Sequence, residues 1–373
     1  MLLTNGTVYD WQFQPKKLNL AIEGERIVQV TDRALSGTDV LDCTDCTVVP
    51  GFIDIHIHGG GGGDMADASE ASLHKMSVYL ARHGVTSFCP ASMTLPNDEL
   101  IAQFQAVERF KGHEQGAYIH GINMEGPYIS MEKKGAQCGE YVRAADYAEF
   151  ATLNSVSRIA LVDVAPETEG AVEFAQRASK LCTVSMAHTA ATFSEAETAL
   201  QNGFTHATHL FNAMTSVGHR EPGVPTAVFD SEHATAELIC DGFHVHPAVL
   251  RMAFRQLGED RAVVVSDSMR AAGCADGAYT LGGQTVYVRD GKARLADGTI
   301  AASTSNLYDE FLNLLSYGVP FRSALKACTK NPAIVAGVFS QTGSIETGKY
   351  ADLLVLDGER KICAVIVRGR RVV

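Results

Sequence analysis

Short apolar runs alternate with longer helical patterns through the middle of the chain. Eight such runs place apolar and β-branched residues on consecutive positions, which is typical of strands buried on both faces. They lie at 48–55, 85–91, 117–124, 160–165, 183–187, 206–210, 235–240 and 262–266. Helical periodicity follows most of them, at 69–83, 97–110, 170–181, 194–202, 247–257 and 305–317. Ser69 and Ser194 occupy N-cap positions, and Gly84, Gly203 and Gly318 stand where helices end. The alternation predicts an α/β fold with a parallel sheet.

Both ends of the chain differ from this middle region. Short strand-like segments of alternating polarity lie at 2–9, 18–22, 26–31, 351–356 and 363–373. We therefore expect a small β-sandwich domain made from residues 1–49 and 343–373, and a TIM-like (β/α)8 barrel over 50–342. An open doubly wound sheet is the rival fold. The absence of a glycine-rich dinucleotide turn after the first strand disfavours it.

Composition places the chain among ordinary globular proteins. Of its 373 residues, 46% are hydrophobic and 20% are charged. The net charge of −12 disfavours non-specific binding to nucleic acid or to a membrane surface. No apolar run reaches the roughly 20 residues of a membrane span, and the N-terminal residues lack a signal-peptide pattern. The nine cysteines, an odd number, favour free thiols in a reducing compartment, so we expect a cytoplasmic protein.

Polar residues gather where the predicted strands end. These ends carry Asp54, His56 and His58 on the first strand, Glu125 on the third, His188 on the fifth, His209 and Asn212 on the sixth, Asp241 and His244 on the seventh, and Asp267 on the eighth. In a barrel all C-terminal strand ends meet on one face, where active sites lie. We therefore expect these residues, far apart in sequence, to converge.

The chemistry of these residues is that of a metal centre. His56 and His58 are two positions apart, so both side chains project from the same side of a strand. Glu125, His188 and His209 supply further ligands, and such donors suit zinc or a similar transition metal. Asp267 is the candidate for proton transfer. A lone histidine is more often a packed or surface residue, so the prediction rests on four histidines and two carboxylates together.

Several phrases of the sequence resemble the amidohydrolase superfamily and, within it, the N-acetylglucosamine-6-phosphate deacetylases. The segment from Pro50 to Gly59 contains the His-x-His signature, which is general to the superfamily. Further matching phrases are Glu125-Gly126-Pro127, Lys133-Lys134-Gly135-Ala136, Ala187-His188-Thr189, His209 to Met214, Arg220-Glu221-Pro222-Gly223, Asp241 to His244 and Ser266-Asp267. The tail from Gly343 to Asp352 resembles the superfamily's return to its small β domain. The resemblance covers nearly the whole chain.

The resemblance implies a deformed (β/α)8 barrel whose principal metal is bound by Glu125, His188 and His209. His56 and His58 are both present for a second ion, so we expect one or two divalent ions, zinc or iron. Asp267 matches the catalytic aspartate. The residues that match substrate contacts are Ala136, Gln137, Asn212, Ala213, Arg220, His244, Ile300, Ala301 and Ala302. Gln137 is a departure, because some members carry a histidine there, which can become a cation.

The activity that the resemblance implies is hydrolysis of the N-acetyl group of N-acetylglucosamine-6-phosphate, giving acetate and glucosamine-6-phosphate. Arg220 and His244 would hold the phosphate. Members of the family are typically homodimers, and their active site can borrow a basic residue from the neighbour.

Three alternatives stay open. The substrate's galacto epimer would suit the same chemistry. A cyclic amidase usually carries a carboxylated lysine at the end of the fourth strand, and residues 160–166 contain none. A catalytically dead sugar-phosphate binder would typically have lost a ligand or the catalytic acid, and all of these are present.

Overall fold

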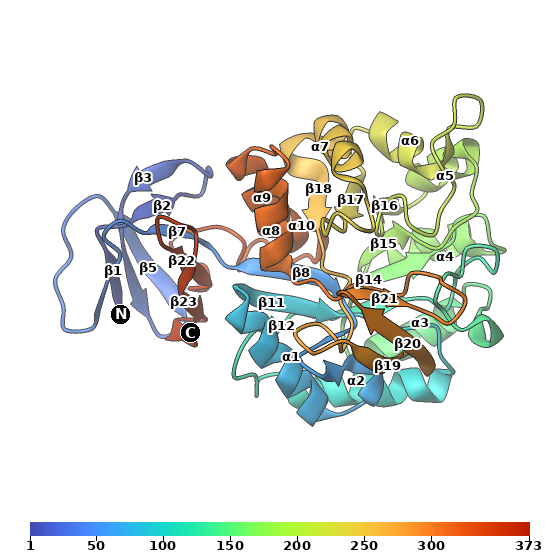
Figure 1. Ribbon diagram of the computed structural model, residues 1–373, viewed down its shortest axis with the longest axis horizontal. Coiled ribbons are helices and arrows are strands. Elements are labelled where there is room, and N and C mark those ends of the chain that lie inside the picture. The colour runs from blue at the N-terminus through green and yellow to red at the C-terminus, as the bar shows by residue number, and fades with distance from the viewer.

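A computed structural model describes residues 1–373 and shows a curled parallel sheet surrounded by helices (Figure 1). Its eight main strands are β8 (Phe52–Ile57), β11 (Val85–Pro90), β13 (Ile122–Glu125), β14 (Ile159–Val164), β15 (Thr183–Met186), β16 (Phe204–Ala207), β17 (Thr235–Leu238) and β18 (Ala262–Val264). All eight predicted strands are therefore present. The first predicted strand, 48–55, spans two elements, because β7 (Thr47–Pro50) ends before β8 begins. The third is likewise divided into β12 (Tyr118–Ile119) and β13.

The parallel strands form two sheets that meet at both seams. One sheet has the order β12-β11-β8 and the other runs from β13 to β18 in sequence order. A parallel bridge between Ala91 and Asn123 joins them at one seam. At the other seam the Asp267 N–H donates to the His56 carbonyl oxygen at 2.9 Å. The strands thus curl round on themselves, consistent with a deformed (β/α)8 barrel.

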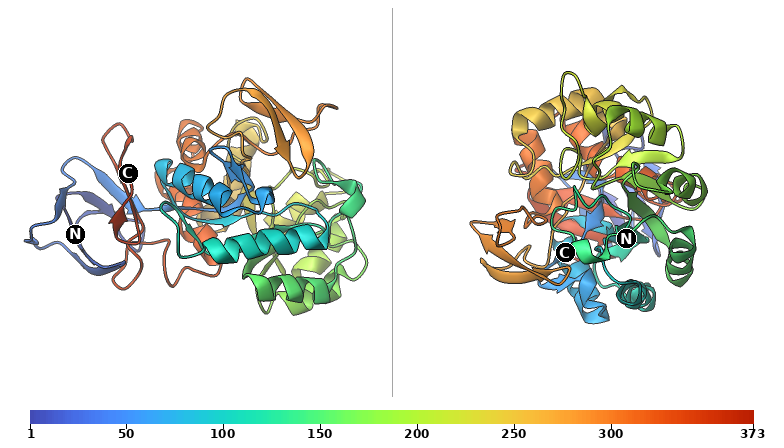
Figure 2. Two further views of the ribbon diagram at one scale, coloured as in Figure 1. Left: turned by 90° about the horizontal axis from the view of Figure 1, so that it is seen from below. Right: turned by 90° about the vertical axis from the view of Figure 1, so that its right-hand side faces the viewer.

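Helices cover the outside of the curled sheet, as the end-on view shows (Figure 2). The predicted helices correspond to α1 (Glu70–Arg82), α2 (Asn97–Phe110), α4 (Ala171–Ala178), α5 (Phe193–Leu200), α7 (Pro247–Arg261) and α8 (Leu307–Ser316). Helix α5 is capped by Thr192 in a capping box with Glu195, so the predicted cap at Ser194 is wrong. None of the helices combines the length and apolar character that a bilayer span requires.

Four helices are not predicted from the sequence pattern. They are α3 (Tyr147–Val156), α6 (Gly223–Asp230), α9 (Phe321–Cys328) and α10 (Lys330–Val335). Helix α6 begins at Pro222-Gly223, a pair that ordinarily marks a turn. Pro332 lies inside the short α10, and Thr329 separates that helix from α9 with non-helical backbone angles.

An antiparallel sheet of three strands, also not predicted, stands between β18 and α8 at the edge of the barrel (Figure 2). It consists of β19 (Gly277–Leu281), β20 (Gln284–Arg289) and β21 (Lys292–Arg294). The turn between β20 and β21 is Asp290-Gly291, and both residues have positive φ, as a type I′ hairpin turn requires. We call this element the hairpin sheet.

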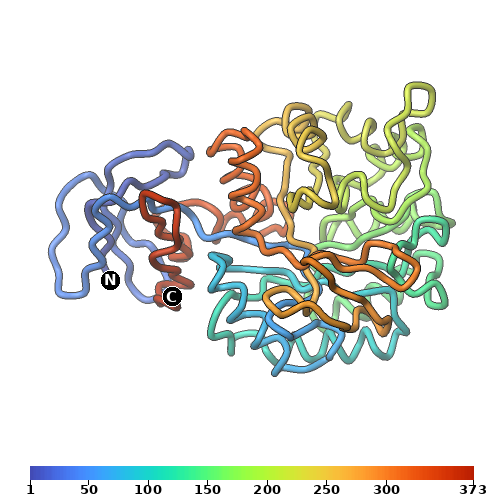
Figure 3. The backbone as a smooth tube through the Cα atoms, in the orientation of Figure 1, coloured from blue at the N-terminus to red at the C-terminus, as the bar shows by residue number.

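The two chain ends build a separate β region beside the barrel (Figure 3). One of its sheets has the order β5-β4-β1-β6 and the other the order β24-β23-β22-β7-β2-β3. The strands are β1 (Leu2–Thr4), β2 (Thr7–Tyr9), β3 (Pro15–Lys17), β4 (Asn19–Glu23), β5 (Arg26–Thr31), β6 (Val40–Asp42), β22 (Leu353–Leu356), β23 (Ile362–Val367) and β24 (Arg370–Arg371). A cluster of 13 buried residues from both sheets forms a core distinct from that of the barrel.

Candidate active site

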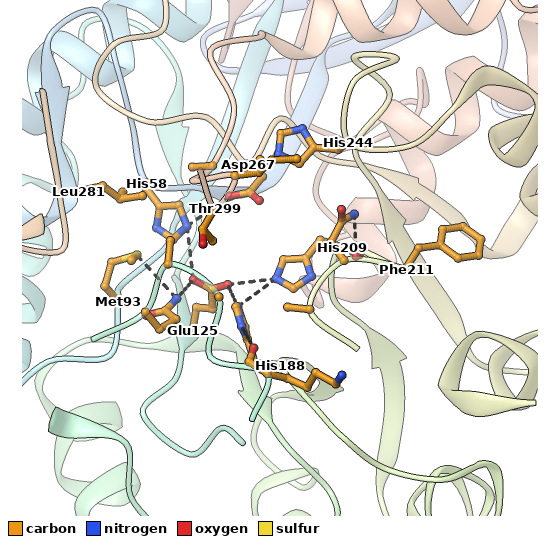
Figure 4. A pocket seen from close by; sticks show the side chains of 18 of the residues that line it. His58, Met93, Glu125, His188, His209, Phe211, His244, Asp267, Leu281 and Thr299 are labelled. Carbon is orange, nitrogen blue, oxygen red and sulfur yellow. Dashed lines mark hydrogen bonds and ion pairs between the residues drawn. The ribbon is translucent and has the colours of Figure 1, made fainter. Parts of the chain in front are cut away.

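A cavity of about 440 Å³ opens where the barrel strands end (Figure 4). Twelve of the predicted site residues line it: His58, Glu125, Ala136, Gln137, His188, His209, Asn212, Ala213, His244, Asp267, Ile300 and Ala302. His56 and Ala301 do not line the cavity because both are fully buried, although His56 Nε2 lies 3.8 Å from the cavity-lining Asp267 Oδ1. Arg220 is exposed on the loop before α6 and does not line this cavity.

Glu125, His188 and His209 form a compact group of donor atoms. Glu125 Oε1 lies 3.0 Å from His188 Nε2 and 3.2 Å from His209 Nε2, and the two imidazole nitrogens are 3.2 Å apart. A tetrahedral ion with bonds of about 2.0–2.2 Å separates its ligand atoms by roughly 3.3–3.6 Å. The three donors therefore already have nearly the spacing that a small divalent cation imposes.

A second group of donors shares Glu125 with the first. His58 Nε2 lies 3.3 Å from both Glu125 Oε2 and Asp267 Oδ1, and His56 Nε2 lies 3.8 Å from Asp267 Oδ1. His56 Nε2 and the buried Asp163 Oδ2 make no hydrogen bond. Buried polar atoms are almost always satisfied, so these two atoms are fitting ligands for a cation. The residues present thus fit a metal at this place too.

The backbone at three strand ends aims these side chains inward. His188, His209 and Asp267 follow β15, β16 and β18, and their φ angles are +43°, +30° and +44°. Residues other than glycine rarely adopt this left-handed region, because the Cβ atom meets the neighbouring backbone. Such conformations cluster at functional sites, where the surrounding fold enforces them.

Outer contacts fix the orientation of the imidazole rings. His56 Nδ1 lies 2.9 Å from Glu237 Oε2, and His188 Nδ1 donates to the Lys133 carbonyl oxygen at 2.9 Å. Both contacts leave Nε2 facing the centre of the site, which is the usual second contact of a metal-binding histidine. Glu237 is not predicted as a site residue from the sequence. An acidic residue inside the apolar run 235–240 was the available signal, and the same holds for Asp163 within 160–165.

Gln137 is held between two partners at the wall of the cavity. Its Nε2 donates to Glu125 Oε2 at 2.6 Å, and its Oε1 accepts the Thr94 N–H at 2.7 Å. The side chain is 2% exposed. Gln137 thus orients Glu125 through Oε2, whereas His188 and His209 contact Oε1, so the predicted substrate contact also supports a candidate metal ligand.

His244 is poised as a cation at the cavity wall. Burial alone would lower the pKa of its imidazole, but the hydrogen bond and the charge of Asp241 outweigh burial and raise that pKa. Asp241 Oδ2 lies 2.7 Å from His244 Nδ1, and its Oδ1 accepts the backbone N–H groups of Phe243 and His244. The arrangement keeps a positive charge available for an anionic group.

Several residues that line the cavity are not predicted from the sequence. Leu281 comes from the tip of the hairpin sheet, Thr299 from the loop after that sheet, and Met93 from the segment after β11. These are ordinary apolar or hydroxyl residues, which carry no chemical signature in a sequence. Only the fold brings them to the cavity.

Comparison with known proteins identifies the family. The profile of the Amidohydrolase family matches residues 47–372, which is most of the chain. The chain therefore belongs to the amidohydrolase family, a family of metal-dependent hydrolases. Membership and the two donor groups together indicate a divalent metal at this site.

Two curated relatives have the same level of similarity to this chain. N-acetylglucosamine-6-phosphate deacetylase of Bacillus subtilis is 34% identical over 87% of this chain and 84% of its own. N-acetylgalactosamine-6-phosphate deacetylase of Escherichia coli O157:H7 is also 34% identical, over 86% of each chain. The two relatives therefore do not separate the epimers.

Solved structures of the same kind superpose over nearly the full length. N-acetylglucosamine-6-phosphate deacetylase of Pasteurella multocida has a TM-score of 0.93 and 28% identity, covering 99% of this chain and 98% of its own. An aspartate-to-alanine mutant of the Mycobacterium smegmatis enzyme, solved with N-acetyl-D-glucosamine-6-phosphate, has a TM-score of 0.93 and 32% identity. It covers 100% of this chain and 99% of its own.

Proposed function

We propose that the chain hydrolyses the N-acetyl group of N-acetylglucosamine-6-phosphate, releasing acetate and glucosamine-6-phosphate. The observation that carries this proposal is the position of Asp267, which lies 3.3 Å from His58 Nε2 in the same cavity as Glu125, His188 and His209. A proton-transfer group and a metal-ligating group thus face one space. Relatives at 34% identity named for this activity support the substrate class.

The metal is proposed to be zinc or iron, because imidazole and carboxylate donors suit both. Glu125, His188 and His209 would hold the principal ion, and His56 and His58 would hold a second one. A bound divalent ion polarises a carbonyl oxygen and makes water a nucleophile at neutral pH.

The chain's own residues supply proton transfer and substrate binding. Asp267 accepts the proton of the attacking water and then donates it to the amine nitrogen. Without this proton the nitrogen would have to leave as an anion, which is a poor leaving group. His244, charged through Asp241, binds the phosphate. Gln137 holds Glu125 in place, and the walls of the cavity exclude bulk water from the amide.

The galacto epimer is a second candidate substrate, because the E. coli relative named for it is as similar as the first. The test is acetate release by protein reloaded with zinc or iron. It is offered N-acetylglucosamine-6-phosphate, its galacto epimer and the unphosphorylated sugar. Preference for N-acetylglucosamine-6-phosphate supports the proposal. Preference for the galacto epimer supports the same reaction with that epimer as the substrate. No acetate from any of them, with metal bound, contradicts the proposal.

Asp267→Asn tests the proton-transfer role. We expect kcat to fall about 10²–10⁴-fold, the usual contribution of a general acid–base group. Metal content, measured by elemental analysis, should remain near that of the wild type. Asp230→Asn, at the exposed end of α6, is the matched control and should keep full activity. Near-normal turnover by Asp267→Asn would refute the assignment.

We propose that the enzyme is a homodimer in which Arg220 serves the neighbouring site. Arg220 is exposed and outside its own subunit's cavity, yet a guanidinium suits phosphate oxygens. The family resemblance implies that Arg220 contacts the phosphate, so we propose that Arg220 of the partner subunit supplies this contact.

We also propose that residues 1–49 and 343–373 form a β-sandwich domain and residues 50–342 the catalytic domain. The separate 13-residue core between the two terminal sheets supports this division. A cytoplasmic location is likewise proposed, and it is supported by nine cysteines that are all free thiols.

A further inference from the structure

The outer side of the hairpin sheet is a basic face. Its members are Tyr287, Arg289, Lys292 and Arg294, all exposed, while Val286, Val288 and Ala293, which alternate with them, are buried. The register pairs Arg289 directly with Lys292 and Tyr287 with Arg294. Like charges directly opposite each other destabilise an antiparallel pair. The sheet therefore maintains a repulsive pair at a position where an acidic partner would have stabilised it.

No acidic side chain forms a salt bridge with this face, although the exposed Asp290 lies in the turn between Arg289 and Lys292. Arg289, Lys292 and Arg294 form no salt bridge. The neighbouring Arg270, in contrast, forms salt bridges with Asp64 and Asp67. Two other nearby carboxylates accept backbone N–H groups. Asp276 accepts the N–H groups of the Asp290-Gly291 turn, and Asp297 accepts the Thr299 N–H. The three cations of the basic face thus have no salt-bridge partner within the chain and can pair with an anion from outside.

A hollow of about 480 Å³ lies on this face. Besides the four members of the basic face, Leu295, Ala296 and Gly298 line it. Tyr287 is 43% exposed, so a sugar ring can pack on its aromatic face. Guanidinium groups bind phosphate oxygens through paired N–H donors. The combination fits a small phosphorylated sugar.

The hollow adjoins the phosphate end proposed for the catalytic cavity. Lys292 Nζ and Arg294 Cζ lie 5.2 Å and 5.1 Å from the centre of the Phe243 ring. Phe243 directly precedes His244, which lines the catalytic cavity. Along the chain, Gly298 lines the hollow, whereas the next two residues line the catalytic cavity.

We propose that the basic face is an encounter site that attracts the phosphorylated substrate and passes it to His244. The inference rests on the proposed function and adds the route by which the substrate arrives. A protein of net charge −12 repels a sugar phosphate over most of its surface. A local cluster of cations replaces this repulsion with attraction at the entrance of the catalytic cavity. Such electrostatic attraction raises the association rate of an anionic substrate at low ionic strength.

Arg289→Gln combined with Lys292→Gln tests the proposal. Neither side chain forms a hydrogen bond or salt bridge within the chain, whereas Arg294 donates to the Gly298 carbonyl oxygen and is left intact. We expect kcat/KM for N-acetylglucosamine-6-phosphate to fall roughly three- to tenfold at 10 mM salt. The difference should shrink below about twofold at 0.3 M salt, where the screening length is below about 8 Å. The loss should be confined to the phosphorylated sugar.

Lys17→Gln combined with Arg33→Gln is the matched control, because it removes two cations from an exposed basic cleft of the terminal β region. It should change kcat/KM by less than about 1.5-fold. The inference is overturned if the hairpin variant keeps the wild-type salt dependence, if the control loses as much, or if the unphosphorylated sugar suffers equally. A wild type that releases no acetate at all contradicts the proposed function as well, so the two failures are distinguishable.

Discussion

Gln137 links the backbone at Thr94 to Glu125, and both of its amide ends are used inside the protein. Replacement by leucine keeps much of the volume but removes a hydrogen bond to the buried Glu125 Oε2 and leaves the buried Thr94 N–H unpaired. Loss of such outer contacts typically costs 10–100-fold in metal affinity. We therefore expect Gln137→Leu to weaken zinc binding by about that factor, measured on metal-free protein by competition with a chromophoric chelator.

Gln103→Leu is the control for this prediction, since Gln103 is equally buried but lies in α2, outside the catalytic cavity. It should leave zinc affinity unchanged even where it lowers the melting temperature. If Gln137→Leu binds zinc as tightly as the wild type, the glutamine does not support Glu125 and acts on the substrate alone.

At the scale of single residues the sequence predicted the groups with distinctive chemistry. His58, Glu125, His188, His209 and Asp267 converge because each ends a barrel strand, and that placement follows from the strand pattern. Glu237 was missed because its contact with His56 joins residues on different strands, which no local pattern encodes. Arg220 shows what a sequence motif cannot predict. The motif identifies the residue, but it does not tell whether the side chain of a loop residue faces the cavity.

Helix α8 carries a buried carboxyl group that makes stability depend on pH. Glu310 is fully buried, its Oε2 accepts the Cys240 N–H at 2.8 Å, and its Oε1 has no partner. Burial raises the pKa of this carboxyl well above its usual range, and the charges of Asp241 and Asp54 add to the rise. The folded protein thus holds a proton that the unfolded chain releases near its ordinary pKa.

The sign of the effect follows from this proton. The contribution of Glu310 to stability is fully present below the pKa of the unfolded chain and is lost as pH rises towards the raised pKa of the folded state. Glu310→Gln keeps a neutral side chain at every pH. We expect the melting temperature of the variant to match the wild type near pH 4.5 and to exceed it increasingly up to pH 8. A constant difference across this range, measured calorimetrically, would contradict a buried neutral carboxyl.

At the scale of elements, burial on both faces explains what the pattern predicted. Each barrel strand is buried by the other strands on its inner face and by helices on its outer face. Its residues therefore form a continuous apolar run in the sequence. The hairpin sheet was missed because its strands are short and half polar, although Gly282-Gly283 and Asp290-Gly291 are strong hairpin-turn signals. This element supplies Leu281 to the catalytic cavity and carries the basic face, so a missed element hid part of the site.

At the scale of the whole molecule the position of Arg220 makes a dimer testable through activity. If Arg220 serves the neighbouring subunit, Arg220→Ala and Asp267→Asn damage the same site of a mixed dimer, the site of the subunit that carries Asp267→Asn. One site of that dimer then lacks both residues, while the other has both. A site served by its own Arg220 would instead be damaged in every mixed dimer.

Mixing the two variants under conditions that allow subunit exchange should therefore restore activity. Random exchange makes about half of the dimers mixed, each with one intact site, so recovery should approach about a quarter of the wild-type rate. Each variant alone should stay far below this value at low substrate concentration, because Arg220→Ala raises KM and Asp267→Asn lowers kcat. Sedimentation at the assay concentration is the control, since a monomeric protein contradicts the proposal directly. A dimer that exchanges subunits without recovering activity would mean that Arg220 serves the site of its own subunit. If Arg220→Ala alone keeps the wild-type KM, Arg220 lies outside both phosphate sites, which leaves His244 and the basic face to bind the anion.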